Sequence, residues 1–204
     1  MVPLAGPGGK LAVFELAKSG RIPDGVIPAV INTATVMDFA WDPFRNSRLA
    51  VAMDDGAINL WEVPEGGLYS QVNEPEVRIP AHAEKVNMIR FSPVAADIVA
   101  TSGFDWLIKI WNLSENCKEV AVLEVTITNK DTLETFKTND HCYQGHTDQI
   151  YSMAWSGCGR FLATVCRDGK VRLFCPRQSS SPLREGGDIV AKKGARVLWA
   201  CEGR

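Results

Sequence analysis

The sequence carries no large excess of charge of either sign. Its 204 residues include 22 lysines and arginines and 24 aspartates and glutamates, which gives a formal net charge of −2 and a pI near 5.9. The basic residues are dispersed along the chain rather than gathered in a run. Because nucleic acids and anionic membranes attract a concentrated positive field, this balance indicates no nucleic-acid partner.

Long hydrophobic runs are also missing. The longest apolar stretches, such as residues 26–31, fall short of the roughly 20 residues that span a bilayer, so we expect no transmembrane segment. Residues 1–10 lack the basic and the continuous apolar regions of a secretory signal. The sequence therefore predicts a cytoplasmic or nuclear protein, and its 46% hydrophobic residues suffice for a sizeable core.

Residues that carry catalytic or metal chemistry are few. The chain has three histidines, no G-x-S-x-G motif and no C-x-x-C pair. Its six cysteines are scattered, and in a chain of this size they are expected to be reduced and mostly buried thiols. Cys117, His141, Cys142 and His146 are spaced too irregularly to suggest a zinc site. We expect no enzymatic activity, no metal and no cofactor.

What the sequence does contain is an internal repeat. Residues 36–43, 86–93 and 150–157 each alternate apolar and polar positions, reach an aromatic residue and run into a turn, a pattern typical of a short buried strand. A second unit follows at residues 49–61, 99–111 and 162–174, and it reads as a hairpin. The aromatic residues of the two units lie 20, 20 and 19 residues apart. This regularity predicts three copies of one supersecondary unit.

The repeat predicts an all-β fold, a β-propeller of four-stranded antiparallel blades. The copies are 50 and 63 residues apart, against about 40 to 45 for one propeller blade, so loops absorb the excess. We expect an incomplete propeller over residues 1–204, with three blades and two partial ones, because propellers close with about four to eight. The expected parts are a blade end at 9–16, repeats at about 30–63, 80–113 and 144–175, a loop insertion at 114–143, and the start of a further blade at 188–204.

Three features resemble the signature of WD40 repeats: a histidine four residues before the first strand, an aspartate in the hairpin turn and a terminal tryptophan. In that family these groups and a Ser or Thr form a hydrogen-bonded network, since each buried polar group needs a partner. In the first repeat Asn32 and Val51 stand where His and Thr are expected, and Phe174 replaces Trp in the third. The resemblance implies that the network includes Asp55 and Trp61, then His82, Thr101, Asp105 and Trp111, then His146, Thr164 and Asp168.

A closer resemblance runs through Ala40-Trp41-Asp42-Pro43, Trp61-Glu62-Val63-Pro64, Gly66-Gly67-Leu68 and Cys201-Glu202-Gly203-Arg204. It identifies the chain as similar to the coronins, and most similar to the second propeller of the long type that has two. This resemblance implies a non-enzymatic WD40 scaffold that binds actin filaments and trafficking proteins, located in the cytoplasm and peripherally on the Golgi and vesicles. The alternative is a generic WD40 adaptor, such as the substrate receptor of a ubiquitin ligase.

The expected partner-binding surface is the rim of the propeller that carries the turn aspartates. Loops on a rim are free to vary without cost to the scaffold. Large aromatic residues at exposed turns act as interface anchors, although Phe104 and Trp106 could equally pack against the neighbouring blade. The candidates are Glu84, Lys85, Phe104 and Trp106 in the second blade and Asp148, Gln149 and Arg167 in the third.

Overall fold

The computed structural model describes residues 2–4 (backbone alone), 9–13, 27–114, 116–123, 146–187 and 194–200. These ranges hold sixteen β-strands. No helix in the described ranges is long and apolar enough to cross a membrane. The strands are β1 (Val2–Leu4), β2 (Lys10–Ala12), β3 (Ala29–Ile31), β4 (Val36–Trp41), β5 (Arg48–Met53), β6 (Ala57–Glu62), β7 (Gln71–Val72), β8 (Val77–Pro80), β9 (Val86–Phe91), β10 (Ile98–Gly103), β11 (Ile108–Asn112), β12 (Lys118–Leu123), β13 (Ile150–Trp155), β14 (Leu162–Cys166), β15 (Val171–Phe174) and β16 (Arg184–Gly186).

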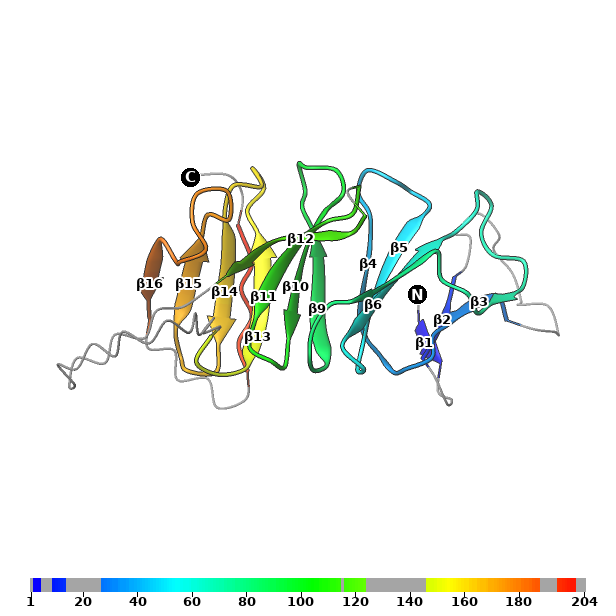
Figure 1. Ribbon diagram of the computed structural model, residues 1–204, viewed down its shortest axis with the longest axis horizontal. Coiled ribbons are helices and arrows are strands. Elements are labelled where there is room, and N and C mark those ends of the chain that lie inside the picture. Colours follow the sequence, from blue (N-terminus) through cyan, green and yellow to red (C-terminus); the bar gives the residue numbers. More distant parts are fainter. Residues whose placement is uncertain are drawn as a thin grey trace.

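The strands form four four-stranded sheets that follow one another in chain order along the long axis of the molecule (Figure 1). We call them the N-terminal sheet (β1-β2-β3-β7), the first blade (β4-β5-β6-β8), the second blade (β9-β10-β11-β12) and the third blade (β13-β14-β15-β16). Pairing is antiparallel throughout the three blades, as expected for propeller blades. The N-terminal sheet departs from this pattern, since β3 pairs with β7 in parallel.

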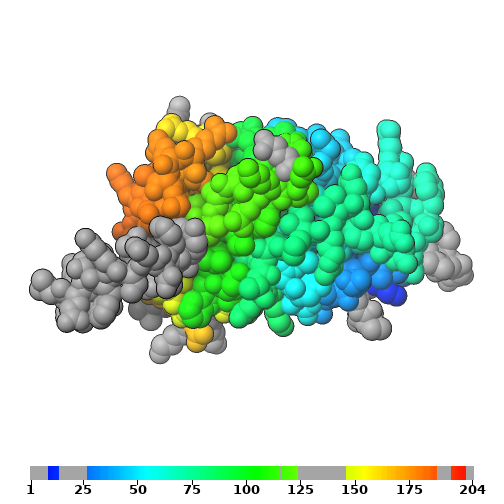
Figure 2. Space-filling view, viewed as in Figure 1, coloured from blue at the N-terminus to red at the C-terminus, as the bar shows by residue number. Residues whose placement is uncertain are grey.

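Apolar side chains fill the spaces between neighbouring sheets. One core cluster joins the N-terminal sheet to the first blade and includes Leu11, Val30 and Trp61. A second joins the first and second blades, and a third joins the second and third blades around Ile108 and Phe174. Figure 2 shows the result as bands of colour that lie against each other in sequence order. Because each blade buries its faces only against its neighbours, strands such as β5 are apolar on both faces and fully buried.

Two expectations differ from the structure in the outer strands of the blades. The range 114–143, expected as a loop insertion, contains β12, which is the fourth strand of the second blade. Its apolar residues alternate only weakly, and pairing with β11 provides the order that the pattern alone does not predict. The third blade likewise gains its fourth strand, β16, beyond the expected repeat at 144–175. The remaining residues of the expected insertion, 124–143, and residues 144–145 lie outside the described ranges.

The expected partial blades at the two ends also differ. β2 lies between β1 and β3 inside its sheet and is not the outer strand of a blade. Residues 194–200, expected to begin a further blade, form no strand. Instead the indole of Trp199 stacks on Phe161 with ring centroids 6.4 Å apart and donates a hydrogen bond to the carbonyl of Ala154. Residues 14–16, 188–193 and 201–204 of these expected ends lie outside the described ranges.

Candidate functional site

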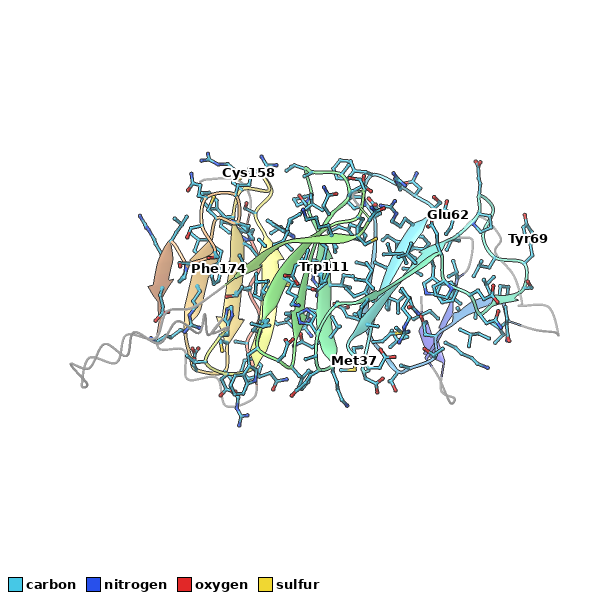
Figure 3. The ribbon with its side chains drawn as sticks, in the orientation of Figure 1. Met37, Glu62, Tyr69, Trp111, Cys158 and Phe174 are labelled. Atoms are coloured by element: carbon cyan, nitrogen blue, oxygen red, sulfur yellow. The ribbon has the colours of Figure 1, made fainter. Side chains whose placement is uncertain are left out.

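The second blade contains a continuous hydrogen-bonded chain across its strands. The Nδ1–H of His82 donates to the carboxylate of Asp105, with both oxygens at 2.9 Å. His82 Nε2 lies 2.9 Å from Thr101 Oγ1, which also accepts the indole N–H of Trp111 at 3.0 Å. This tautomer lets the threonine hydroxyl donate to Nε2. Trp111 lies near the centre of the ribbon in Figure 3, deep within the second blade. All four side chains thus have partners, which buried polar groups require.

Asp105 is held ionised by this arrangement. Burial raises the pKa of its carboxyl, but the hydrogen bond from His82 and the backbone N–H groups of Leu107 and Ala83 outweigh burial, so the pKa lies below its usual value. The carboxylate therefore fixes both the histidine and the two turns that surround it. The site is a structural clasp that joins the loop before β9 to the turn between β10 and β11.

A glycine creates the space for this clasp. A Cβ atom at Gly103 would lie 2.4 Å from Asp105 Oδ1 and 2.6 Å from His82 Nδ1, closer than real Cβ contacts allow. The close approach of carboxylate and imidazole therefore requires glycine at this position. The WD40 signature does not include this position, so it was not among the predicted site residues.

The third blade holds the corresponding residues in a different arrangement. His146 Nε2 lies 3.0 Å from Thr164 Oγ1, but His146 Nδ1 has no partner among the described residues. Asp168 is hydrogen-bonded to Arg172 Nη2 at 2.6 Å and to the hydroxyl of Thr147 instead. Phe174 packs its ring 5.6 Å from that of His146. The structure thus brings together His146 and Thr164 but not His146 and Asp168.

This rearrangement shifts two pKa values. Burial, reinforced by the positive charge of Arg172, lowers the pKa of His146 to about 4. Burial raises the pKa of Asp168, but the hydrogen bonds from Arg172 and Thr147 outweigh it and lower the pKa to about 2. His146 is therefore neutral and Asp168 ionised at neutral pH.

Cys166 is one position at which the third blade differs from the second. It stands two residues after Thr164 and two before Asp168, the place that Gly103 has in the second blade. The Sγ of Cys166 donates to the carbonyl of Asp148, and Asp168 binds Arg172 instead of His146. Arg172 is itself buried and also binds Glu185 of β16 at 2.8 Å. The ion pair between Arg172 and Glu185 therefore holds β16, the outermost strand of the third blade, in place.

The first blade replaces the histidine with an amide. Asn32 Oδ1 accepts hydrogen bonds from Asn59 Nδ2 at 2.9 Å and from the indole of Trp61 at 3.1 Å, while Asn32 Nδ2 donates to the carbonyl of Gly9. The expected turn residue Asp55 makes no direct bond to Asn32 but pairs with Arg78 at 2.6 Å, and Arg78 also lies 3.5 Å from Asn59 Oδ1. Asn59 was missed from the sequence, although a polar residue two positions before the terminal tryptophan of a buried strand is a usable signal.

No group of three or more metal-ligating side chains occurs within the described residues. Cys117, Cys158, Cys166 and Cys175 are free thiols, and of these Cys166 and Cys175 are buried whereas Cys158 is exposed. Burial raises the pKa of the Cys166 thiol. His141, Cys142 and Cys201 lie outside the described ranges.

The predicted rim residues lie on connected loops. Phe104 N–H donates to the carbonyl of Lys85, and Arg167 N–H donates to that of Gln149. The N–H of His146 donates to the carbonyl of Trp106, so the rims of the second and third blades are joined. Glu84, Lys85 and Arg167 are exposed, whereas Phe104, Asp148 and Gln149 are half-buried. Trp106 is 47% exposed and has a φ of 64°.

Comparison with known proteins gives consistent results. The family model "WD domain, G-beta repeat" matches residues 73–112 and 137–175. Coronin-7 of Rattus norvegicus is 44% identical over 202 residues, covering 99% of this chain and 20% of that protein, and Coronin-7 of Homo sapiens is 42% identical over 203. The coronin-like protein of Saccharomyces cerevisiae is 32% identical over 96% of this chain and 28% of its own length.

A solved structure shows the same fold. The WD40 domain of Toxoplasma gondii coronin superposes with a TM-score of 0.73 at 23% identity, covering 90% of this chain and 42% of that one. The chain spans about a fifth to under a third of the length of the curated relatives it matches.

Proposed function

Since the chain belongs to the coronin family of WD40-repeat proteins, we propose that it is a non-enzymatic scaffold that binds partner proteins, acting in actin filament organisation and in Golgi-linked vesicle traffic. The family and the fold support the scaffold role. The actin and trafficking roles, and a place in the cytoplasm and on Golgi-derived vesicles, rest on the resemblance to coronins.

The proposed docking surface is the rim of the second and third blades that carries the turn aspartates. It consists of Glu84, Lys85, Phe104, Trp106, Asp148, Gln149 and Arg167. The clasp around Asp105 holds the loops of the second blade in place, so a partner meets a preorganised surface and orders few groups on binding. The proposed network around Asp105 thus holds in place the loops that form the proposed docking surface.

Trp106 carries this proposal. Nearly half of its side chain is exposed, and its positive φ is uncommon for a bulky residue. Such a conformation costs about 1 to 3 kcal/mol and persists only where the surroundings impose it, which is characteristic of ligand-binding positions. An exposed, rigidly held tryptophan is also the residue type that most often anchors a protein interface.

Charged groups surround this anchor and set its partner preference. Lys85 and Glu84 lie on the loop before β9, and Arg167 lies on the third blade with Asp148 3.9 Å from its guanidinium. Both signs are therefore present, as on a rim that selects a partner by charge pattern. This mixed surface favours a folded protein partner over a uniformly charged polymer.

The test is co-sedimentation of the chain with actin filaments. Trp106→Ala should weaken binding about tenfold, as for an interface anchor, and Arg167→Glu should weaken it less. The matched control is Phe44→Ala, because Phe44 is also 47% exposed but lies in the turn between β4 and β5, at the other end of the strands. No pelleting with filaments, or equal loss in Trp106→Ala and Phe44→Ala, would contradict the proposal for actin.

The trafficking role is tested by affinity purification from cells and by imaging against a Golgi marker. Recovery of vesicle-traffic proteins that depends on Trp106 is the expected result. Recovery of ubiquitin-ligase subunits without cytoskeletal or trafficking proteins would instead support the generic adaptor.

A further inference from the structure

A pocket lies between the second and third blades on the side of the molecule away from the proposed docking rim. Its lining includes Ser92, Ile98, Ile110, Ala121, Trp155 and Arg177. It contacts the beginning of β10, whereas Gly103 and the rim lie at the end of that strand. Cys158, in the adjacent turn, and Met37 mark the two opposite ends of the strands in Figure 3.

The pocket lies at the edge of the apolar core cluster between the second and third blades. Ile98, Ala121 and Trp155 are partly buried side chains that pack against the core cluster between these blades. On one edge, the turns of the two blades touch so closely that a Cβ at Gly159 would lie 2.1 Å from Val94 Cγ2. Gly159 has a φ of 64°, so glycine is needed there for both reasons. Gly159 is itself a lining residue, so this contact between the two turns lies at the edge of the pocket.

The size and polarity of the pocket suit an apolar side chain. Its volume is about 260 Å³, below the roughly 300 to 1,000 Å³ of pockets for drug-sized ligands, so it accepts one or two side chains. The polar groups of its lining already have partners: the indole N–H of Trp155 donates to the carbonyl of Arg90, and Ser92 Oγ accepts the N–H of Ala95. A polar group that enters between Ser92 and Trp155 would therefore lose its water without gaining a bond there, and Arg177 is the lining residue with a free polar group.

The free charge beside the pocket is positive. Arg177 lines the pocket and is exposed, and Arg160 is exposed on the turn between β13 and β14. No carboxylate among the described residues forms an ion pair with either arginine, and Asp97 on the neighbouring turn is already paired with Arg48 and Arg45. The guanidinium of Arg160 lies over the ring of Phe161, 5.5 Å from its centroid, so Arg177 is the group with which an incoming carboxylate makes charge-assisted hydrogen bonds.

We propose that this interblade pocket binds a segment of a partner protein in which one leucine- or phenylalanine-sized side chain is flanked by acidic residues. The apolar side chain fills the gap between Ile98, Ala121 and Trp155, and a carboxylate of the segment contacts Arg177. The site is separate from the docking rim, since it lies at the opposite end of the strands. It does not depend on the rim's proposed function.

The experiment selects short random peptides displayed on phage against the chain and measures the labelled consensus peptide by fluorescence anisotropy. The expected consensus is acidic around one leucine, isoleucine or phenylalanine. Arg177→Glu, an exposed substitution that leaves the core intact, should weaken binding about tenfold through charge repulsion. Ala121→Leu, which fills the pocket, should abolish binding.

The matched controls are Arg184→Glu, at an exposed arginine on β16, and Ala83→Leu, at an exposed alanine far from the pocket. Both should bind the peptide as the unaltered chain does. A neutral or basic consensus, no enrichment at all, or a consensus peptide whose binding survives both pocket variants would overturn the proposal. So would flotation with phosphatidylserine vesicles that is lost in Arg177→Glu without any selected peptide, which would assign the arginines to a lipid surface.

Discussion

The second and third blades carry the same histidine, threonine and aspartate at nearly the same spacing, yet only the second connects them. In the second blade the carboxylate of Asp105 lies 2.9 Å from His82. In the third, Asp168 binds Arg172, and His146 is left with one hydrogen bond. The two blades also differ at the position of Gly103, which Cys166 takes in the third blade. The same histidine, threonine and aspartate therefore give different networks where the surrounding residues differ, here at Cys166, Arg172 and Phe174.

The comparison also shows how a lost contact is replaced. The third blade gives up the bond between His146 and Asp168, but the freed carboxylate joins Arg172 and, through it, Glu185 of β16. In the third blade the carboxylate therefore stabilises the outermost strand, β16, instead of the loop that carries the histidine. A buried arginine with two carboxylates is costly to break, because each partner would be left with an unpaired charge.

The strongest test of this comparison is Gly103→Ala. The added Cβ forces apart His82 and Asp105, and overpacking together with the lost charge-assisted bond should destabilise the fold by about 4 kcal/mol. Denaturant unfolding measures the change. Gly186→Ala is the matched control, since a Cβ there meets nothing within 4 Å.

The explanation by close approach further requires that Gly103→Ala cost much less in an Asp105→Ala background, where one partner of the clash is gone. Equal costs in the two backgrounds would show that Gly103 is needed for another reason.

A smaller effect is expected from acid. The folded-state pKa of His146, about 4, lies below the ordinary value of 6.5, so the unfolded chain takes up this proton first. Stability should therefore fall by about 3 kcal/mol as the pH drops from about 6.5 to about 4, and no further change from this group follows below that. Unfolding free energies measured at a series of pH values in this window provide the test.

The control for this pH dependence is His146→Gln, which removes the titrating group and should flatten the curve over the same window. The loss of the Asp168 contribution comes later, as the pH falls from about 3.8 towards about 2, so the two groups are separable. A curve that is already flat in the unaltered chain between pH 6.5 and 4 would contradict the isolation of His146.

The smallest effect is expected for Trp111→Phe, which gives the second blade the terminal residue of the third. It removes the indole bond to Thr101 and should cost about 1 kcal/mol, measurable as a shift of the denaturation midpoint. Trp41→Phe, at an exposed tryptophan, should stay within about 0.5 kcal/mol. If Trp111→Phe lowered the free energy of unfolding more than Gly103→Ala does, the proposed order of importance within the clasp would be wrong.

Much of the blade architecture could be predicted because its inner strands are long and strongly patterned. β4, β9 and β13 begin at Val36, Val86 and Ile150, where the alternation of the repeat begins, and hairpins with a turn aspartate follow each. In β9 and β13 buried residues recur along the strand, whereas β4 is only partly buried, and all three pair with the fully buried or mostly buried second strand of their blade.

The outer strands and the exceptions to the network could not be predicted in the same way. β16 is short and exposed and β12 is exposed over its first half, and backbone pairing rather than an apolar pattern determines where they form. The bond of Asp168 to Arg172 depends on an arginine four residues after the turn aspartate, a residue that the repeat signature does not include. Asn32 takes the place of the histidine because its side-chain carbonyl oxygen accepts hydrogen bonds from both Asn59 and Trp61.

The order of the strands determines how successive repeats are joined and where the chain can be cut without dividing a blade. The matched repeat at 73–112 supplies β8 to the first blade and β9, β10 and β11 to the second. The sequence repeat is therefore offset by one strand from the blade, which is the unit that folds. Each added copy pairs its first strand with the previous sheet, so a cut before β8 takes the fourth strand from the first blade, whereas a cut in the loop after it, near Ala83, leaves the strand sets of both blades whole.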